Sequence, residues 1–386
     1  MSKIDYGTFE DIRPYNDNEV PAAVARIAHH PHFSKIVCHL IPQQEIEAFR
    51  TQFMQITTIT QFQQMVMLRA IEAMVQKSTT GFSYSGFDKL SGDKNYIFIG
   101  NHRDILLDAA LLQIVLFYHS LDTSEITFGS NLMRGDIVID IGRLNKMFRI
   151  ERGGNARDFY NNSVKVSSYM RHTIIEKRQS TWIAQRNGRT KNGDDKTEMA
   201  VLKMLSLSSN KPFVENLMEL NITPLAISYE YEPCDFLKVA ELYVSNYVKY
   251  VKSPEEDLMS ILHGIAQPKG HIALVATDTI TREELQQCSN QDKNNRFQWL
   301  ANFVDRRIYE NYKLWKTNYI ACDLLQNSER HSTHYTPNDK KEFIEYMNNG
   351  LKEIVGDYEE LRTIFLNIYA SPVANAAGLN SSKNES

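Results

Sequence analysis

Short apolar, β-branched runs alternate with helix-like segments between residues 89 and 285. The runs are NYIFIG, EITFGS, STWIAQ, TPLAISY and HIALVATD. This alternation predicts an α/β domain, because a parallel strand usually returns to its sheet through a helical crossover. We expect a central, mostly parallel or mixed sheet that is flanked by helices. A chain of 386 residues also has length for additions to such a domain.

The regions on both sides of this domain have helical periodicity. Residues 1–88 carry apolar side chains at three- and four-residue spacing, as in EIEAFRTQFMQITTITQFQQMVMLRAIEAMVQK. Residues 286–375 have the same spacing, so we predict a helical N-terminal region, the α/β domain at 89–285, and a helical C-terminal region. The polar segment 376–386 is expected to be a disordered tail.

Composition and charge argue against several classes of protein. With 42% hydrophobic and 23% charged residues, the chain is typical of a globular protein rather than a disordered one. The net charge of −4 argues against a nucleic-acid partner. The four cysteines form no CxxC or CxxH pattern, so we expect reduced thiols, a cytoplasmic location and no metal site. No apolar run reaches the roughly 18 residues of a membrane span, and the start lacks a signal-peptide core.

A polar turn, NHRDILLD, follows the run YIFIG at residues 101–108. A polar turn between a buried strand and a helix lies at the carboxyl edge of the sheet, where open α/β folds bind ligands. A histidine titrates near neutral pH, so His102 is a candidate general base. A carboxylate on the other ring nitrogen would fix its tautomer. We prefer Asp108 for that partner, and Asp104 is the alternative, although Asp104 also suits a helix N-cap.

Basic residues are concentrated between positions 143 and 196, where thirteen Lys and Arg face five Asp and Glu. Most of them suit a solvated helix face, but those beside glycines at strand ends predict an anion site. A guanidinium holds phosphate with two parallel hydrogen bonds, and a glycine lets backbone N–H groups approach the same anion. The candidates for a phosphate contact are Arg152, Arg189, Gly188, Arg149, Lys191 and Arg103, with Arg186 as a further one.

The stretch FSYSGFDKLSGDKNYIFIGNHRDILLDAALL resembles the first block of the glycerolipid acyltransferase superfamily, which includes glycerol-3-phosphate and lysophosphatidic acid acyltransferases. Four later stretches are similar to its further blocks, in the same order: GRLNKMFRIERGGNARD, STWIAQRNGRTKNG, ITPLAISYE and KGHIALVATDTI. Two departures stand out. The family has four residues between His and Asp, whereas five separate His102 from Asp108. Gln185 and Arg186 stand near the usual Glu of the third block.

The resemblance implies direct acyl transfer from acyl-ACP or acyl-CoA to the hydroxyl of a glycerol-phosphate-type lipid acceptor. His102 would be the base, and no acyl-enzyme, cofactor or metal would take part. We favour 1-acyl-glycerol-3-phosphate as the acceptor in phospholipid biosynthesis, with glycerol-3-phosphate as an alternative. The expected location is cytoplasmic and peripheral on the inner face of the membrane. Two further hypotheses remain open: another acceptor, such as an amino-acid-containing lipid, or a non-catalytic lipid-binding protein.

Overall fold

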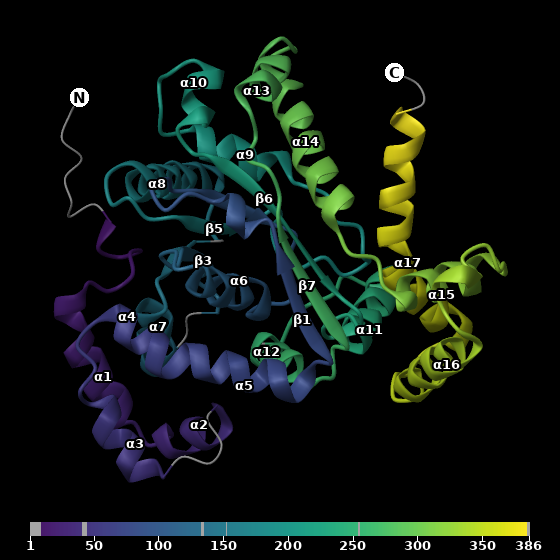
Figure 1. The fold of residues 1–386 in the computed structure, drawn as a ribbon, viewed down its shortest axis with the longest axis horizontal. Coiled ribbons are helices and arrows are strands. Elements are labelled where there is room, and N and C mark those ends of the chain that lie inside the picture. The colour runs from purple at the N-terminus through teal and green to yellow at the C-terminus, as the bar shows by residue number, and fades with distance from the viewer. Residues whose placement is uncertain (1–8, 41–44, 133–134, 152, 254, 384–386) are drawn as a thin grey trace.

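A seven-stranded sheet forms the centre of the molecule (Figure 1). The computed structural model describes residues 9–40, 45–132, 135–151, 153–253 and 255–383. Neighbouring strands are parallel except β6 and β7, which are antiparallel, so the predicted α/β class is confirmed. In spatial order the strands are β1 (Gly81–Ser85), β7 (His271–Ala276), β6 (Ile222–Tyr229), β2 (Ile97–Gly100), β5 (Thr181–Ala184), β3 (Glu125–Gly129) and β4 (Met147–Ile150).

All five apolar runs are strands, but two edge strands were not expected. Strand β1 lies inside the region 1–88 that we predicted to be helical, and it pairs with β7 from Gly81 to Ser85. The predicted boundary at residue 88 is therefore too late. The sequence GFSYS hides this strand because an edge strand is only partly covered, and three of its five residues are exposed. Strand β4 closes the opposite edge beside β3.

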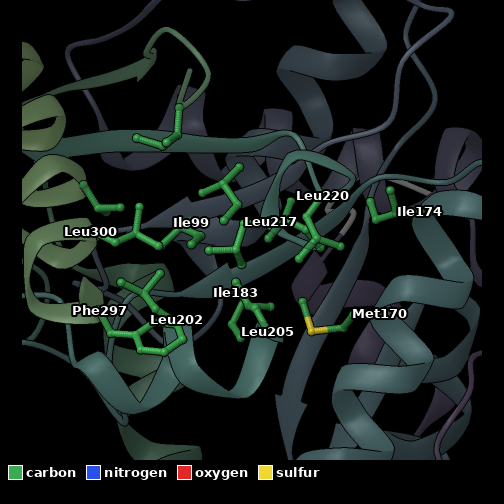
Figure 2. Packing of buried hydrophobic residues seen from close by; sticks show 14 of the residues in the cluster. Ile99, Met170, Ile174, Ile183, Leu202, Leu205, Leu217, Leu220, Phe297 and Leu300 are labelled. Carbon is green, nitrogen blue, oxygen red and sulfur yellow. The ribbon is translucent and has the colours of Figure 1, made fainter. Parts of the chain in front are cut away.

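Helices cover both faces of the sheet, because side chains alternate along each strand. In β2, Ile97 and Ile99 face one core, and Phe98 faces the other. In the first core, Ile99 and Ile183 point toward a layer of helices (Figure 2). That layer consists of α8 (Ala156–Ile175), α9 (Met199–Ser206), α10 (Phe213–Met218), α13 (Arg282–Ser289) and α14 (Arg296–Asn311). The second core packs on α5 (Arg69–Ser78) and α6 (Leu107–Tyr118).

Two further helical groups lie at opposite ends of the molecule (Figure 1). The N-terminal group packs around its own aromatic cluster, which includes Phe33, Phe53 and Phe62. Its elements are η2 (Asp17–Glu19), α1 (Val20–Ala28), α2 (Phe33–Leu40), α3 (Ile46–Phe53), α4 (Ile59–Phe62), the π-helix η3 (Gln63–Leu68) and α7 (Asp136–Leu144). The C-terminal group consists of α11 (Asp235–Tyr247), α15 (Lys316–Gln326), η5 (Ser332–His334), α16 (Pro337–Leu351) and α17 (Tyr358–Lys383). The remaining elements are η4 (Phe87–Lys89) and α12 (Glu256–Ala266).

The last helix corrects one prediction. Residues 376–383, expected to be part of a disordered tail, continue α17 as far as Lys383, and 384–386 lie outside the described residues. The stretch VANAAGLN follows a well-packed half of the helix, and its alanines favour propagation of that helix. None of the helices in the described ranges has both the length and the hydropathy needed to traverse a lipid bilayer.

Candidate active site

The turn after β2 is anchored to the neighbouring strand β6. The Asn101 side chain accepts a hydrogen bond from the Ile227 N–H (2.8 Å) and donates one to the Ile227 carbonyl (2.9 Å). Gly100 ends β2 beside Trp182, and a Cβ at this position would lie 3.0 Å from the Trp182 indole nitrogen. The chain therefore leaves the sheet at a defined point, and His102 follows at the carboxyl edges of β2, β5 and β6.

His102 is paired with Asp108. Its Nδ1 lies 2.9 Å from Asp108 Oδ2, and the edge of its ring packs on Trp182 with centroids 5.8 Å apart. With Nδ1 donating to the carboxylate, the neutral ring presents Nε2 as an acceptor. No described residue forms a hydrogen bond with Nε2, and 11% of the side chain remains exposed. The geometry thus leaves one ring nitrogen for a small molecule.

Asp108 is the second residue of α6. Its Oδ2 also accepts the backbone N–H groups of Arg103 (2.7 Å) and Asp104 (2.9 Å). Its Oδ1 accepts the hydroxyl of Tyr229 (2.7 Å). Four donors therefore hold this carboxylate, which is 2% exposed. Such bonding compensates for the burial of its charge.

Asp104 precedes α6, whose N-cap residue is Leu106 rather than Asp104, and it makes no hydrogen bond to His102. Its Oδ1 accepts the N–H groups of Leu106 (2.9 Å) and Leu107 (2.8 Å). Its Oδ2 has no hydrogen-bond partner among the described residues and faces Gly264, where a Cβ would lie 2.3 Å from it. Burial, with the nearby charge of Asp108, raises the pKa of Asp104. Of the two carboxylates that we considered as partners of His102, only Asp108 is in contact with it.

Arg103 is fully buried, and its nitrogens are already bonded. Nε and Nη2 donate to Asp195 (3.0 and 2.6 Å), and Nη1 donates to Glu232 (3.1 Å). Nη2 also reaches the Gly193 carbonyl, while Lys238 donates to Glu232 and to the Arg103 carbonyl. These bonds occupy the guanidinium, so the structure gives no support to the predicted phosphate contact of Arg103. Its partners come from distant parts of the chain, and together they form a buried ionic network behind the turn.

The loop after β5 brings Arg189 close to the turn. The Thr190 N–H donates to the His102 carbonyl (2.7 Å), which holds this loop against the catalytic candidate. Gly188 has a left-handed φ of 76° and open space where a Cβ would stand, so a side chain here would cost backbone strain. Arg189 Nη1 is buried without a hydrogen-bond partner among the described residues, and Arg186 Nε is in the same situation. A buried guanidinium nitrogen without a partner can donate a hydrogen bond to a bound anion.

The other basic candidates are less well placed. Arg149 lies on the edge strand β4 and forms an ion pair with Glu151. Lys191 forms an ion pair with Glu241 of α11. Arg152 lies outside the described residues. The structure therefore brings Arg189 and Gly188 to the turn, occupies Lys191 with another partner, and leaves Arg149 three strands away from β2.

A cavity of about 420 Å³ lies along one face of α6. It begins at Leu106, in the turn that carries His102, and continues past Ala110, Ile114 and Phe117. Its opposite wall comes from η3 and α5, including Met67, Leu68 and Ile71, and Lys146 and Met147 line its far end. The cavity was not predicted, because its walls come from three separate segments of the chain, residues 60–71, 106–126 and 145–147.

Tyr229 is also absent from the sequence-based candidates. It is the last residue of β6, and Leu225, Ile227 and Tyr229 all face the core that contains α6. Leu225 pairs with Gly100, so β6 continues beyond the end of β2 and carries Tyr229 over the turn. The sequence feature that could have indicated it is the tyrosine at the end of the run TPLAISY, which places a hydroxyl at the same sheet edge as His102. Among the described residues, no group of three or more His, Cys, Asp or Glu side chains could hold a metal ion.

Comparison with known proteins identifies no family for this chain. No protein-family model and no curated protein matches the sequence. Among solved structures, the chain is similar to 1-acyl-sn-glycerophosphate (LPA) acyltransferase PlsC from Thermotoga maritima, with 10% sequence identity and a TM-score of 0.36. The match covers 75% of this chain and 94% of that chain. A TM-score of this size does not establish a common fold, so the site is interpreted from its own residues.

Proposed function

We propose that the chain is an O-acyltransferase that moves a fatty acyl group from acyl-ACP or acyl-CoA to the hydroxyl of a glycerol-phosphate-type acceptor. The observation that carries this proposal is the His102–Asp108 pair at the sheet edge, whose Nε2 is left open. The five sequence blocks support the same activity. We favour 1-acyl-glycerol-3-phosphate as the acceptor.

The pair supplies what direct acyl transfer requires. His102 Nε2 takes the proton of the acceptor hydroxyl while its oxygen attacks the thioester carbonyl carbon. Asp108, bonded to Nδ1, stabilises the imidazolium that forms. When the tetrahedral intermediate collapses, the carbon–sulfur bond breaks and the leaving thiolate takes the proton from Nε2. The products are an ester and a thiol, and His102 returns to its starting state.

The phosphate of the acceptor would bind to Arg189. Its buried Nη1 lacks a partner among the described residues, and the Thr190 contact holds its loop on the His102 carbonyl. A bound phosphate would satisfy that nitrogen and would set the distance between the acceptor hydroxyl and Nε2. Gly188 leaves the neighbouring backbone accessible to the same anion.

The acyl chain of the thioester would occupy the cavity along α6. Most of the side chains that α6 contributes to it are apolar, and its volume lies within the range of small-molecule pockets. Leu106 belongs both to the cavity wall and to the turn that holds His102. An acyl chain bound there would therefore begin near the reacting carbonyl.

The test is acyl transfer with purified protein. Labelled acyl-ACP and acyl-CoA are each incubated with 1-acyl-glycerol-3-phosphate, glycerol-3-phosphate and an amino-acid-containing lipid, and the products are identified by mass spectrometry. We expect His102→Ala to slow transfer by about a hundredfold or more. His32→Ala, which removes an exposed histidine of the N-terminal region, is the matched control and should retain the wild-type rate. Equal rates for His102→Ala and wild type would exclude this mechanism, and binding without turnover would favour a non-catalytic protein.

A further inference from the structure

The two oxygens of Asp108 are held by different parts of the chain. Oδ2 accepts three hydrogen bonds, from His102 Nδ1 and from two backbone N–H groups of the same turn. Oδ1 accepts one, from the hydroxyl of Tyr229 at 2.7 Å, and no other described residue donates to it. Tyr229 is 121 positions away and belongs to a different element, the central strand β6.

The hydrogen bonds from the turn leave one rotation of the Asp108 carboxylate unrestrained. Three donors on a single oxygen fix the position of Oδ2 but not the rotation of the carboxylate plane about it. A second anchor on Oδ1 removes that rotation, and then the direction from which Oδ2 meets the His102 ring is defined. Because Tyr229 lies on a strand that Asn101 bonds twice, at Ile227, the anchor and the turn are linked through the same strand.

The Tyr229 hydroxyl acts as a donor here. Its side chain is 1% exposed, and burial, followed by the charges of Asp108 and Asp104, raises its pKa well above the ordinary value. It therefore keeps its proton and donates it to Oδ1 in a charge-assisted hydrogen bond. Such a bond draws negative charge toward Oδ1, away from the oxygen that faces the imidazole.

We infer that Tyr229 is a positioning residue: its hydroxyl fixes the plane of the Asp108 carboxylate and moderates the charge that His102 meets at Nδ1. The inference rests on the proposed function in one respect, since the acyl transfer rate is one of its two readouts. It adds to that function a residue that never touches the substrate and acts only through Asp108. Removing the hydroxyl would return charge to Oδ2, and His102 would hold its proton more strongly.

Other charged and titratable groups face the pair from several elements. They are Arg103 and Asp104 of the turn, Arg189 of the loop after β5, Glu232 and Lys238 after β6, Asp195 beside Arg103, and Tyr312 after α14. Tyr229→Phe changes none of these charges and removes a single oxygen atom. A shift in the titration of His102 in this variant would therefore originate at Oδ1.

The experiment compares Tyr229→Phe with Tyr169→Phe. Tyr169 is an equally buried tyrosine whose hydroxyl also donates to a carboxylate, that of Glu125, at 2.6 Å. Glu125 is the first residue of β3, so this pair lies at the amino end of the strand, whereas His102 lies at the carboxyl edge of the sheet. Both variants lose one buried charge-assisted hydrogen bond, so both should lose stability by a similar amount. Only Tyr229→Phe should change the titration midpoint of His102.

Two readouts are measured on the full chain. The first is the titration of His102 by NMR on histidine-labelled protein, with its signal assigned from its loss in His102→Gln. We expect the midpoint in Tyr229→Phe to move to higher pH by roughly half a unit to one unit, which corresponds to part of one charge-assisted hydrogen bond. The second is the pH dependence of acyl transfer, whose acid limb should move in the same direction while kcat falls about tenfold and the acceptor KM stays constant.

The outcomes separate this inference from the proposed function. Equal His102 midpoints in Tyr229→Phe and Tyr169→Phe would overturn the role of Tyr229, even if wild-type protein transfers acyl groups. A shifted midpoint without any labelled lipid product would support the role of Tyr229 and contradict the acyltransferase proposal. If Tyr229→Phe does not fold, site-specific 3-fluorotyrosine at position 229 keeps the shape of the residue and makes its hydroxyl a stronger donor to Oδ1. The His102 midpoint should then move to lower pH, and an unmoved midpoint overturns the inference.

Discussion

Asn substitutions at Asp108 and Asp104 form a matched pair that tests the centre of the proposed site. An Asn at 108 retains one oxygen to accept the three N–H donors that now reach Oδ2, and its amide would face the Tyr229 hydroxyl, which can also accept. The variant thus keeps the shape of the site and loses the negative charge. An Asn at 104 can still accept the N–H groups of Leu106 and Leu107, and it never touches His102.

The size of the effect follows from the geometry. His102 Nδ1 and Asp108 Oδ2 are 2.9 Å apart, and both side chains are nearly buried. Two unit charges about 4 Å apart in an effective dielectric of about 20 attract each other by about 4 kcal/mol. That attraction exists only when the imidazole is protonated, as it is after it has taken the hydroxyl proton. Asp108→Asn should therefore lower kcat by about a thousandfold, since each 1.36 kcal/mol corresponds to a factor of ten.

The assay is the initial rate of labelled lipid formation at saturating thioester, with circular dichroism and thermal melting as checks on folding. Asp104→Asn should lose at most about 1 kcal/mol of stability, the usual net contribution of one hydrogen bond, and should change kcat by less than about threefold. The reasoning is refuted if a folded Asp108→Asn protein keeps the wild-type kcat. It is equally refuted if Asp104→Asn loses as much activity as Asp108→Asn, because Asp104 would then be the functional partner.

Three further predictions concern the acceptor, the acyl chain and stability. Arg189→Ala should raise the KM for a phosphate-bearing acceptor at least tenfold, since it removes a charged donor, whereas Arg149→Ala should leave that KM unchanged; equal effects of the two variants would contradict the assigned phosphate site. Ala110→Leu should shift the preference toward shorter acyl donors, measured as kcat/KM over a series of thioesters, because the larger side chain fills the cavity; an unchanged series would exclude the cavity as the acyl site. Burial raises the pKa of Asp235 to about 6, so the folded state binds a proton that the unfolded state releases at lower pH, and stability contributed by this group falls as pH rises from about 4 to about 6. Relative to Asp235→Asn, wild type should lose up to about 3 kcal/mol of unfolding free energy across that window in urea titrations, and parallel curves would contradict the raised pKa.

The sequence allowed the central strands of the fold to be predicted, but not its edges. A strand buried on both faces needs an apolar, β-branched run, and β2, β5 and β6 have one. An edge strand such as β1 is exposed along much of its length, so GFSYS carries no comparable signal. The same limit applies to the end of α17, where polar side chains are compatible with a solvated helix as well as with a tail.

Side-chain partners set a similar limit for the site. His102 was recognised from its position in a polar turn, because that position depends only on local sequence. Arg103 is bonded to Asp195 and Glu232, which are 92 and 129 residues away in the sequence. No local sequence pattern indicates that these two carboxylates neutralise its charge. The choice between Asp104 and Asp108 depends on where α6 begins, and a boundary uncertain by two residues cannot decide it.

The five-residue spacing between His102 and Asp108 becomes intelligible once the start of α6 is known. Asp108 is the second residue of α6, and the chain between it and His102 does not by itself fix the carboxylate relative to the ring. Two features do so. Asp104 Oδ1 accepts the N–H groups of Leu106 and Leu107 at the start of α6, while Tyr229 ties Oδ1 of Asp108 to β6, which is bonded to the turn through Asn101. The contact between His102 and Asp108 is thus held by hydrogen bonds within the turn and by an anchor from another strand.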